Sequence, residues 1–147
     1  NDKNKEDYGR LEEAYTEIEQ TLGIAAIRLE YMPQNLIYTN TVITGDTATM
    51  LFKCGDNYFN VVQQIRSVEN SSGITSDRNN SNGNTVYNNW LNKTIEIQTS
   101  SVDNQKIEYS AEVIFEDSYY YLSGVIDKDD FVNIVKNLYI ETGERDK

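Results

Sequence analysis

Aromatic side chains are the residues of this chain whose types and spacing best suit ligand binding; the sequence holds 11 Tyr, 4 Phe and 1 Trp. Tyr119, Tyr120 and Tyr121 are consecutive in a strand-like run, so their side chains alternate between the two faces of a sheet. A solvent-facing Tyr120, together with Tyr87 and Trp90, would form an aromatic platform for a carbohydrate, a peptidoglycan fragment or a peptide. Aromatic residues also fill cores and favour strands, which is their more common role. We name Tyr87, Trp90 and Tyr120 as candidate ligand-binding residues.

Acidic side chains could bind a cation at two places. Asp127, Asp129 and Asp130 could supply the oxygen ligands that Ca²⁺ prefers. Acidic residues at the start of a helix also complement the helix dipole, which is the simpler explanation. The stretch 77–83 resembles the start of an EF-hand loop, but that motif needs Gly at its sixth position and Glu at its twelfth, and both positions hold Asn. We therefore predict no metal site.

Catalytic groups are harder to find. Glu108, Glu112 and Glu116 share one face of a predicted strand, but residues four apart on a strand lie about 13 Å apart. Paired catalytic carboxylates of glycosidases lie about 5–9.5 Å apart, so this row is better explained as a solvated face. Cys54 has no His partner and acidic neighbours, which favours an inert thiol. We predict no catalytic or cofactor-binding residue, and a protein that is not an enzyme.

Composition supports these exclusions. The 147 residues amount to about one domain. Because the sequence contains no His, Ser-His-Asp catalysis and zinc sites with His ligands are excluded. Thirteen basic and 24 acidic residues give a formal net charge of −11, which opposes binding to nucleic acid. We therefore expect no nucleic-acid partner.

The elements that must position these residues follow from hydrophobic periodicity. Apolar residues at helical spacing predict a helix over 8–22, which ends before Gly23. A second helix begins at Asp127, with Phe131, Ile134, Val135 and Leu138 as its apolar stripe. Between them, strand-like runs cover 24–30, 36–44, 47–54, 58–68, 85–91, 93–99, 106–116 and 119–125, and Gly45-Asp46 and Gly55-Asp56 are hairpin signals.

This order predicts an α+β fold: an N-terminal helix, an antiparallel sheet of about seven or eight strands and a C-terminal helix. We expect both helices to pack on one face of the sheet. The predicted organisation is a linker over 1–7, a single domain over 8–142 with a flexible loop at 69–84, and a tail over 143–147.

Two segments are similar to a known family. They are LEEAYTEIEQTLGIAAIRLEYMPQNLIYTNTVITGDTATMLFKCGDNYFNVVQQ, with a helix ending at Gly23 and Tyr-Met-Pro at 31–33, and IFEDSYYYLSGVIDKDDFVNIVKNL, with Tyr-x-Leu-x-Gly before a helix. Together they resemble a family of Gram-positive bacteria, the domain of unknown function DUF forty-three sixty-seven. The resemblance covers most of the chain outside the Asn-rich loop. Where the family commonly has Trp before the final hairpin, this chain has Phe115.

The resemblance implies a setting and no catalytic residues. Members of that family follow a transmembrane helix or a lipoprotein signal, in anti-sigma-factor-like or lipoprotein-like proteins. The first residue, Asn1, also indicates a processed or trimmed chain. We expect an extracytoplasmic, membrane-tethered domain at the bacterial cell surface. The segment itself has no membrane-spanning stretch and would be tethered by a missing upstream anchor.

Two functions compete at this point. The first is a non-enzymatic interaction or sensing module whose partner is an unknown protein, a cell-wall component or a small molecule. The alternative is a lipoprotein-like carrier that holds an apolar ligand between the sheet and the helices. A carrier needs an apolar cavity of several hundred Å³, lined by residues such as Leu11, Ile18, Phe131 and Val135, whereas a binding module has a filled core and an exposed patch.

Overall fold

The structure is a computed structural model that describes residues 2–65, 84–102 and 105–141, with side chains from residue 9 onward. The predicted loop at 69–84 lies outside the described residues except for Asn84, as does the predicted tail over 143–147. The elements are, in order, α1 (Asp2–Leu22), β1 (Ile27–Leu29), β2 (Leu36–Thr44), β3 (Thr47–Cys54), β4 (Asn57–Ile65), β5 (Thr85–Asn88), β6 (Lys93–Val102), β7 (Lys106–Phe115), β8 (Ser118–Gly124), α3 (Lys128–Lys136) and β9 (Leu138–Ile140).

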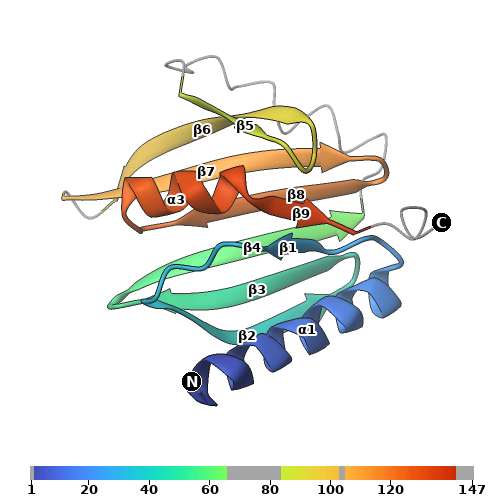
Figure 1. The fold of residues 1–147 in the computed structure, drawn as a ribbon. Helices are drawn as coiled ribbons and strands as arrows, with labels where there is room; N and C mark the ends of the chain where they lie inside the picture. Colours follow the sequence, from blue (N-terminus) through green and yellow to red (C-terminus); the bar gives the residue numbers. More distant parts are fainter. Residues whose placement is uncertain (1, 66–83, 103–104, 142–147) are drawn as a thin grey trace.

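The strands form two sheets (Figure 1). Seven strands make one sheet in the order β2-β3-β4-β8-β7-β6-β5, and β1 and β9 make a second, two-stranded sheet. Every recorded strand pairing is antiparallel. The predicted α+β class with a large antiparallel sheet is therefore confirmed. None of the helices in the described ranges is long and apolar enough to cross a membrane.

Both ends of the described chain differ from the sequence prediction. Helix α1 begins at Asp2, six residues before the predicted start, so residues 2–7, which the sequence predicted as a linker, are helical. Its predicted end is confirmed, because Gly23 has φ +74° and its N–H donates to the carbonyl of Glu19 at 2.9 Å. At the other end, α3 stops at Lys136 and Leu138 begins β9, which pairs with β1. The helical spacing of Leu138 predicted that it lies in the second helix. It belongs instead to a strand whose partner lies more than 100 residues away in sequence.

Three hairpin turns connect the central strands. Gly45 and Gly55 have φ of +59° and +62°, and each opens a two-residue turn at the predicted place. The turn between β7 and β8 consists of Glu116 and Asp117, one residue earlier than the sequence indicates. Glu116 adopts φ +54°, a conformation that favours glycine.

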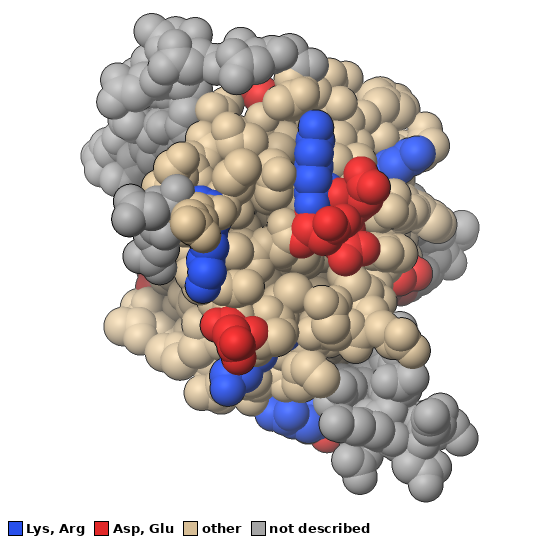
Figure 2. Space-filling model, turned by 90° about the vertical axis from the view of Figure 1, so that its left-hand side faces the viewer, with Lys and Arg blue, Asp and Glu red and all other residues tan. Residues whose placement is uncertain are grey.

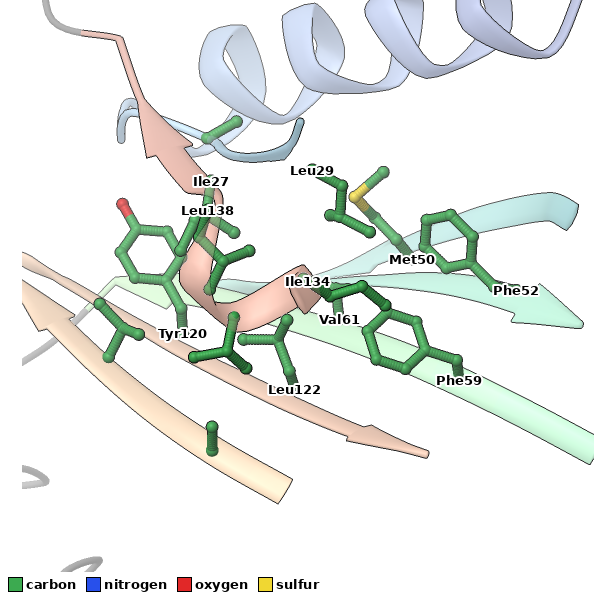
Figure 3. Packing of buried hydrophobic residues seen from close by; sticks show 14 of the residues in the cluster. Ile27, Leu29, Met50, Phe52, Phe59, Val61, Tyr120, Leu122, Ile134 and Leu138 are labelled. Carbon is green, nitrogen blue, oxygen red and sulfur yellow. The ribbon is translucent and has the colours of Figure 1, made fainter. Parts of the chain in front are cut away.

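The core lies on one face of the large sheet, where alternate residues of β3, β4, β7 and β8 point inward (Figure 3). Phe59, Val61, Tyr120 and Leu122 are completely buried there. Ile27 of β1, Ile134 of α3 and Leu138 of β9 pack above them. A fully buried side chain of this size contributes roughly 1.5–3 kcal/mol relative to an exposed one, so this face dominates the stability of the fold.

An arginine of α1 reaches the edge of the sheet. The Arg10 guanidinium donates to the carbonyl of Tyr38 at 3.3 Å and to that of Thr39 at 2.7 Å. It also lies 4.9 Å from the centre of the Tyr38 ring. The register of β2 against β3 shifts between Tyr38 and Asn40 at the same place. Helix α1 is thus fixed to the irregular part of edge strand β2 by a charged side chain.

Candidate functional site

The predicted aromatic platform does not form as proposed. Tyr120 has no exposed surface, and its hydroxyl donates to the carbonyl of Ala25. Burial raises the pKa of the Tyr120 hydroxyl to about 12. Its assignment as a ligand-binding residue was therefore wrong, because the face of β8 that it occupies is covered by β1, β9 and α3 (Figure 3).

Tyr87 and Trp90 are exposed, but they belong to different surroundings. Tyr87 is 48% exposed on β5, and its hydroxyl donates to the side chain of Asn92. Trp90 is 51% exposed in the turn after β5, and its ring meets that of Tyr139 edge-on at 5.0 Å. Tyr139 belongs to β9, so Trp90 lies beside the two-stranded sheet.

A buried asparagine holds the turn that presents Trp90. Asn88 is completely buried, and its amide donates to the carbonyls of Val135 at 2.7 Å and Leu138 at 3.0 Å. Its side-chain oxygen accepts the N–H of Leu91 at 2.8 Å. Asn88 therefore connects this turn to the end of α3 and to β9. The sequence gives no sign of this role, since Asn is common in exposed turns.

A pocket of about 470 Å³ lies where α1, β1 and β9 meet. Its floor is made by buried residues, and its rim carries charged and aromatic residues. The lining residues are Leu11, Glu12, Tyr15, Arg28, Leu29, Glu30, Tyr139 and Glu141. Because Tyr139 also contacts Trp90, the pocket and the exposed indole form one continuous surface. We call this surface, the pocket together with Trp90, the β1–β9 site.

Arg28 is the central charge of the β1–β9 site. Its side chain is only 14% exposed, and its guanidinium lies 3.0 Å from Glu12, 3.5 Å from Glu19 and 4.0 Å from Glu141. Burial by itself lowers the pKa of Arg28, but Glu19 and Glu12 raise it by more, so the group stays charged. Its Nε–H is buried and has no hydrogen-bond partner within the described structure.

Tyr15 forms the aromatic floor beneath that guanidinium. The Arg28 guanidinium carbon lies 4.8 Å from the centre of the Tyr15 ring, within the range of a cation–π contact. The Tyr15 hydroxyl accepts the N–H of Leu29 at 3.0 Å. Burial raises the pKa of Tyr15 to about 12, so the ring is neutral at ordinary pH. An arginine inside the short apolar run 24–30 was the one sequence signal that could have pointed to this site.

The acidic groups singled out from the sequence have structural partners. Asp127 caps α3 by accepting the N–H of Asp129 at 3.2 Å, and Asp130 accepts the hydroxyl of Tyr31 at 3.0 Å. Glu108 accepts the hydroxyl of Tyr58 at 2.6 Å. No group of three or more potential metal ligands occurs among the described residues. The EF-hand-like stretch 77–83 lies outside them.

A second, wider hollow of about 640 Å³ lies at the end of the large sheet where α3 begins. Cys54 lines it, is itself buried, and accepts the side-chain amide of Asn35 at 3.4 Å. Burial raises the pKa of the Cys54 thiol, which agrees with an inert role. Figure 2 views this end of the molecule and shows a cluster of acidic side chains beside a basic one, with further basic side chains around them.

Of the two hollows, the β1–β9 site has the more distinctive chemistry, because a buried cation, several carboxylates and aromatic rings converge there. A comparison with known proteins adds no relative: no protein-family model matches the chain, and no curated protein matches it.

Proposed function

We propose that this chain is a non-enzymatic, extracytoplasmic interaction or sensing module of a membrane-anchored bacterial protein, and that it engages its partner at the β1–β9 site. The observation that carries the proposal is the pairing of a filled core with a surface pocket that continues into an exposed Trp90. Pockets with aromatic walls and a few converging polar groups are the usual places for specific binding. Tryptophan, tyrosine and arginine are also the residues that most often dominate binding energy.

The proposal takes both helices and the small sheet to cover one face of the large sheet, which leaves the other face in contact with solvent. Contacts on the core face support this arrangement. Phe131 of α3 meets Phe59 edge-on at 6.1 Å, and Gln63 of the same face accepts the N–H of Ile27 in β1 at 2.8 Å. Arg10 of α1 lies on Tyr38, which points to that face as well.

The state of the core favours an interaction module over a carrier. The residues expected to line an apolar cavity are instead packed: Ile18, Phe131 and Val135 have no exposed surface and Leu11 has 2%. Only Leu11 of these four borders the pocket, whose rim is charged. A charged rim suits a polar partner, since burying unpaired carboxylates against an apolar ligand would be unfavourable.

A titration followed by backbone amide NMR shifts tests the binding site. Muropeptides and short peptides of different net charge would be added separately to the labelled chain. The proposal expects at least one class to shift the amides of β1, β9 and the turn at Trp90, with a saturable dependence on concentration. Amides at Gly55 and Lys106, which border the other hollow, serve as the internal control. Shifts confined to that control region, or no shifts with any class, would contradict the proposal.

The cellular setting needs a separate experiment. The full-length natural protein that contains this segment would be produced in a Gram-positive host with an epitope tag inside the segment. An extracytoplasmic domain is digested when protease is added to intact cells. Protection from protease until the cells are lysed would overturn the extracytoplasmic part of the proposal and leave the binding site to be judged by NMR.

A further inference from the structure

We infer that the β1–β9 site binds the cationic head group of an arginine or lysine side chain in a basic segment of a partner protein. The inference rests on the proposed function and deepens it, because it gives the chemical class that the pocket recognises. It depends on the charge of the pocket, on how the pocket already holds a cation, and on the exposed aromatic surface beside it.

The charge of the pocket is negative. Glu12, Glu30 and Glu141 line it, and Arg28 is the only basic residue among the lining residues. The Arg28 guanidinium is itself within 4.0 Å of three carboxylates, one of which, Glu19, lies outside the lining. Three carboxylates therefore lie within 4.0 Å of one guanidinium and a fourth, Glu30, lines the same pocket, and the excess negative charge favours a cationic ligand. The formal net charge of −11 also attracts a basic partner over longer distances.

Arg28 shows how this pocket holds a guanidinium. One face of the group lies 4.8 Å from the Tyr15 ring centre, while its edge lies 3.0 Å from a carboxylate oxygen of Glu12. A second cation finds the same two kinds of partner in the pocket, because Tyr139, Glu30 and Glu141 also line it. Cation–π attraction combined with a carboxylate is a recognised way to bind ammonium and guanidinium groups.

The surface beside the pocket favours a protein segment over a small free amine. Trp90 is 51% exposed and stands edge-on to Tyr139, at the border of the pocket. A small amine would fill the pocket and leave this aromatic surface uncovered. A polypeptide that places one basic side chain in the pocket can lay its flanking residues across Trp90, which adds buried apolar area.

The chain carries its own reporter for this test, because Trp90 is its only tryptophan. The probes are short peptides, acetylated and amidated, with one arginine between alanine and leucine residues. Matched peptides replace the arginine by citrulline, which is neutral and nearly the same shape, or by glutamate. Free arginine amide is a fourth probe. Trp90 fluorescence is measured against the concentration of each probe at low ionic strength.

Two substitutions and one control separate the site from general electrostatic attraction. Glu30→Gln and Glu141→Gln, combined in one variant, remove two charges from the pocket. Glu30 and Glu141 are both exposed, so the fold should be kept, which circular dichroism checks. Glu96→Gln in β6 makes the same chemical change outside the pocket lining.

The expected result is saturable binding of the arginine peptide, about tenfold or more weaker binding of the citrulline peptide, and weaker binding by the double variant but not by Glu96→Gln. Binding should also weaken as salt is raised.

Equal binding of the arginine and citrulline peptides, or stronger binding of the glutamate peptide, would overturn the cationic specificity and leave the proposed site standing. Free arginine amide binding as tightly as the peptide would overturn the assignment to a protein segment. Absence of binding by every probe would count against both proposals.

Discussion

The large sheet has two halves, β2-β3-β4 and β8-β7-β6-β5, which meet at the inner strands β4 and β8. The two halves have the same arrangement of turn and inner strand but different contacts in the core. In each half a two-residue turn, Gly55-Asp56 or Glu116-Asp117, leads into the inner strand. The inner strands β4 and β8 pair about Val61 and Leu122, so that Phe59 lies opposite Gly124 and, symmetrically, Tyr120 lies opposite Gln63. Each inner strand thus places one ring on the core face, opposite one residue of the other inner strand.

What lies opposite each ring decides its role. A Cβ atom at Gly124 would come within 2.7 Å of the Phe59 ring and 2.8 Å of the carbonyl of Tyr58, so this position must be glycine. Gln63 instead accepts the N–H of Ile27 and, through its amide, donates to the carbonyl of Ile27 at 3.4 Å. Tyr120 donates to the nearby carbonyl of Ala25. The Phe59–Gly124 pair is fixed by close packing, while the Gln63–Tyr120 pair holds β1, the strand that carries Arg28, by hydrogen bonds.

The largest effect is expected where the packing is tightest. Gly124→Val should lower the free energy of unfolding by about 3 kcal/mol or more, because the new side chain overlaps the backbone and ring of Phe59. Urea denaturation followed by circular dichroism measures the change. Ser123→Val, on the next residue and the opposite face, is the control and should cost much less. Similar losses of stability for the two variants would contradict the close approach of Gly124 to Phe59.

A smaller effect on stability is expected from pH. It distinguishes Tyr120 from Phe59, since only the Tyr120 hydroxyl can lose a proton. Its pKa is about 12 in the folded chain and about 10 when unfolded. The stability that comes from keeping it neutral is therefore complete below pH 10 and is lost as pH rises towards 12, by roughly 2–3 kcal/mol in all. Burial also raises the pKa of Tyr15 to about 12, so its contribution to stability is lost over the same pH range. Tyr120→Phe should roughly halve the fall in stability between pH 10 and 12, as measured by urea midpoints; an unchanged fall would contradict this.

The hydrogen-bonded pair of Gln63 and Tyr120 can be tested at Gln63. Gln63→Leu should cost about 2 kcal/mol, because the buried N–H of Ile27 loses its acceptor. The more specific result is local: hydrogen exchange at Ile27 should speed up, while exchange at Phe59 in the closely packed pair changes only with global stability. An amide of Ile27 that stays as protected as in the parent chain would show that β1 is held by other contacts.

The smallest effect concerns the turns. Glu116 has φ +54°, and the corresponding residue of the other half is Gly55 at +62°. Glu116→Gly should raise the free energy of unfolding by about 1 kcal/mol, because glycine relieves the left-handed conformation. Gly55→Glu should lower it by a similar amount. Calorimetric melting of both variants tests the pair, and changes of the same sign would break the proposed equivalence of the turns.

Local patterns predicted the elements well, and the site poorly. The strand bounds of β2 and β3 and the ends of their hairpin follow from alternation and from Gly45, all of which act over a few residues. By contrast, the β1–β9 site depends on two three-residue strands that pair across almost the whole chain. Tyr120 was misassigned for the same reason: alternation places it on one face of β8, but only tertiary packing decides which face is covered.

The contact between Arg10 and β2 has a consequence for solubility. Strand β2 is nine residues long, carries no charged side chain and stands at the edge of the sheet, which are features of strands that add to other chains. By occupying the carbonyls of Tyr38 and Thr39, the Arg10 guanidinium blocks two of the backbone groups through which a foreign strand would pair. Helix α1 therefore protects part of the β2 edge from pairing with other chains. We expect a shortened chain that lacks α1 to expose this edge strand and to aggregate more readily.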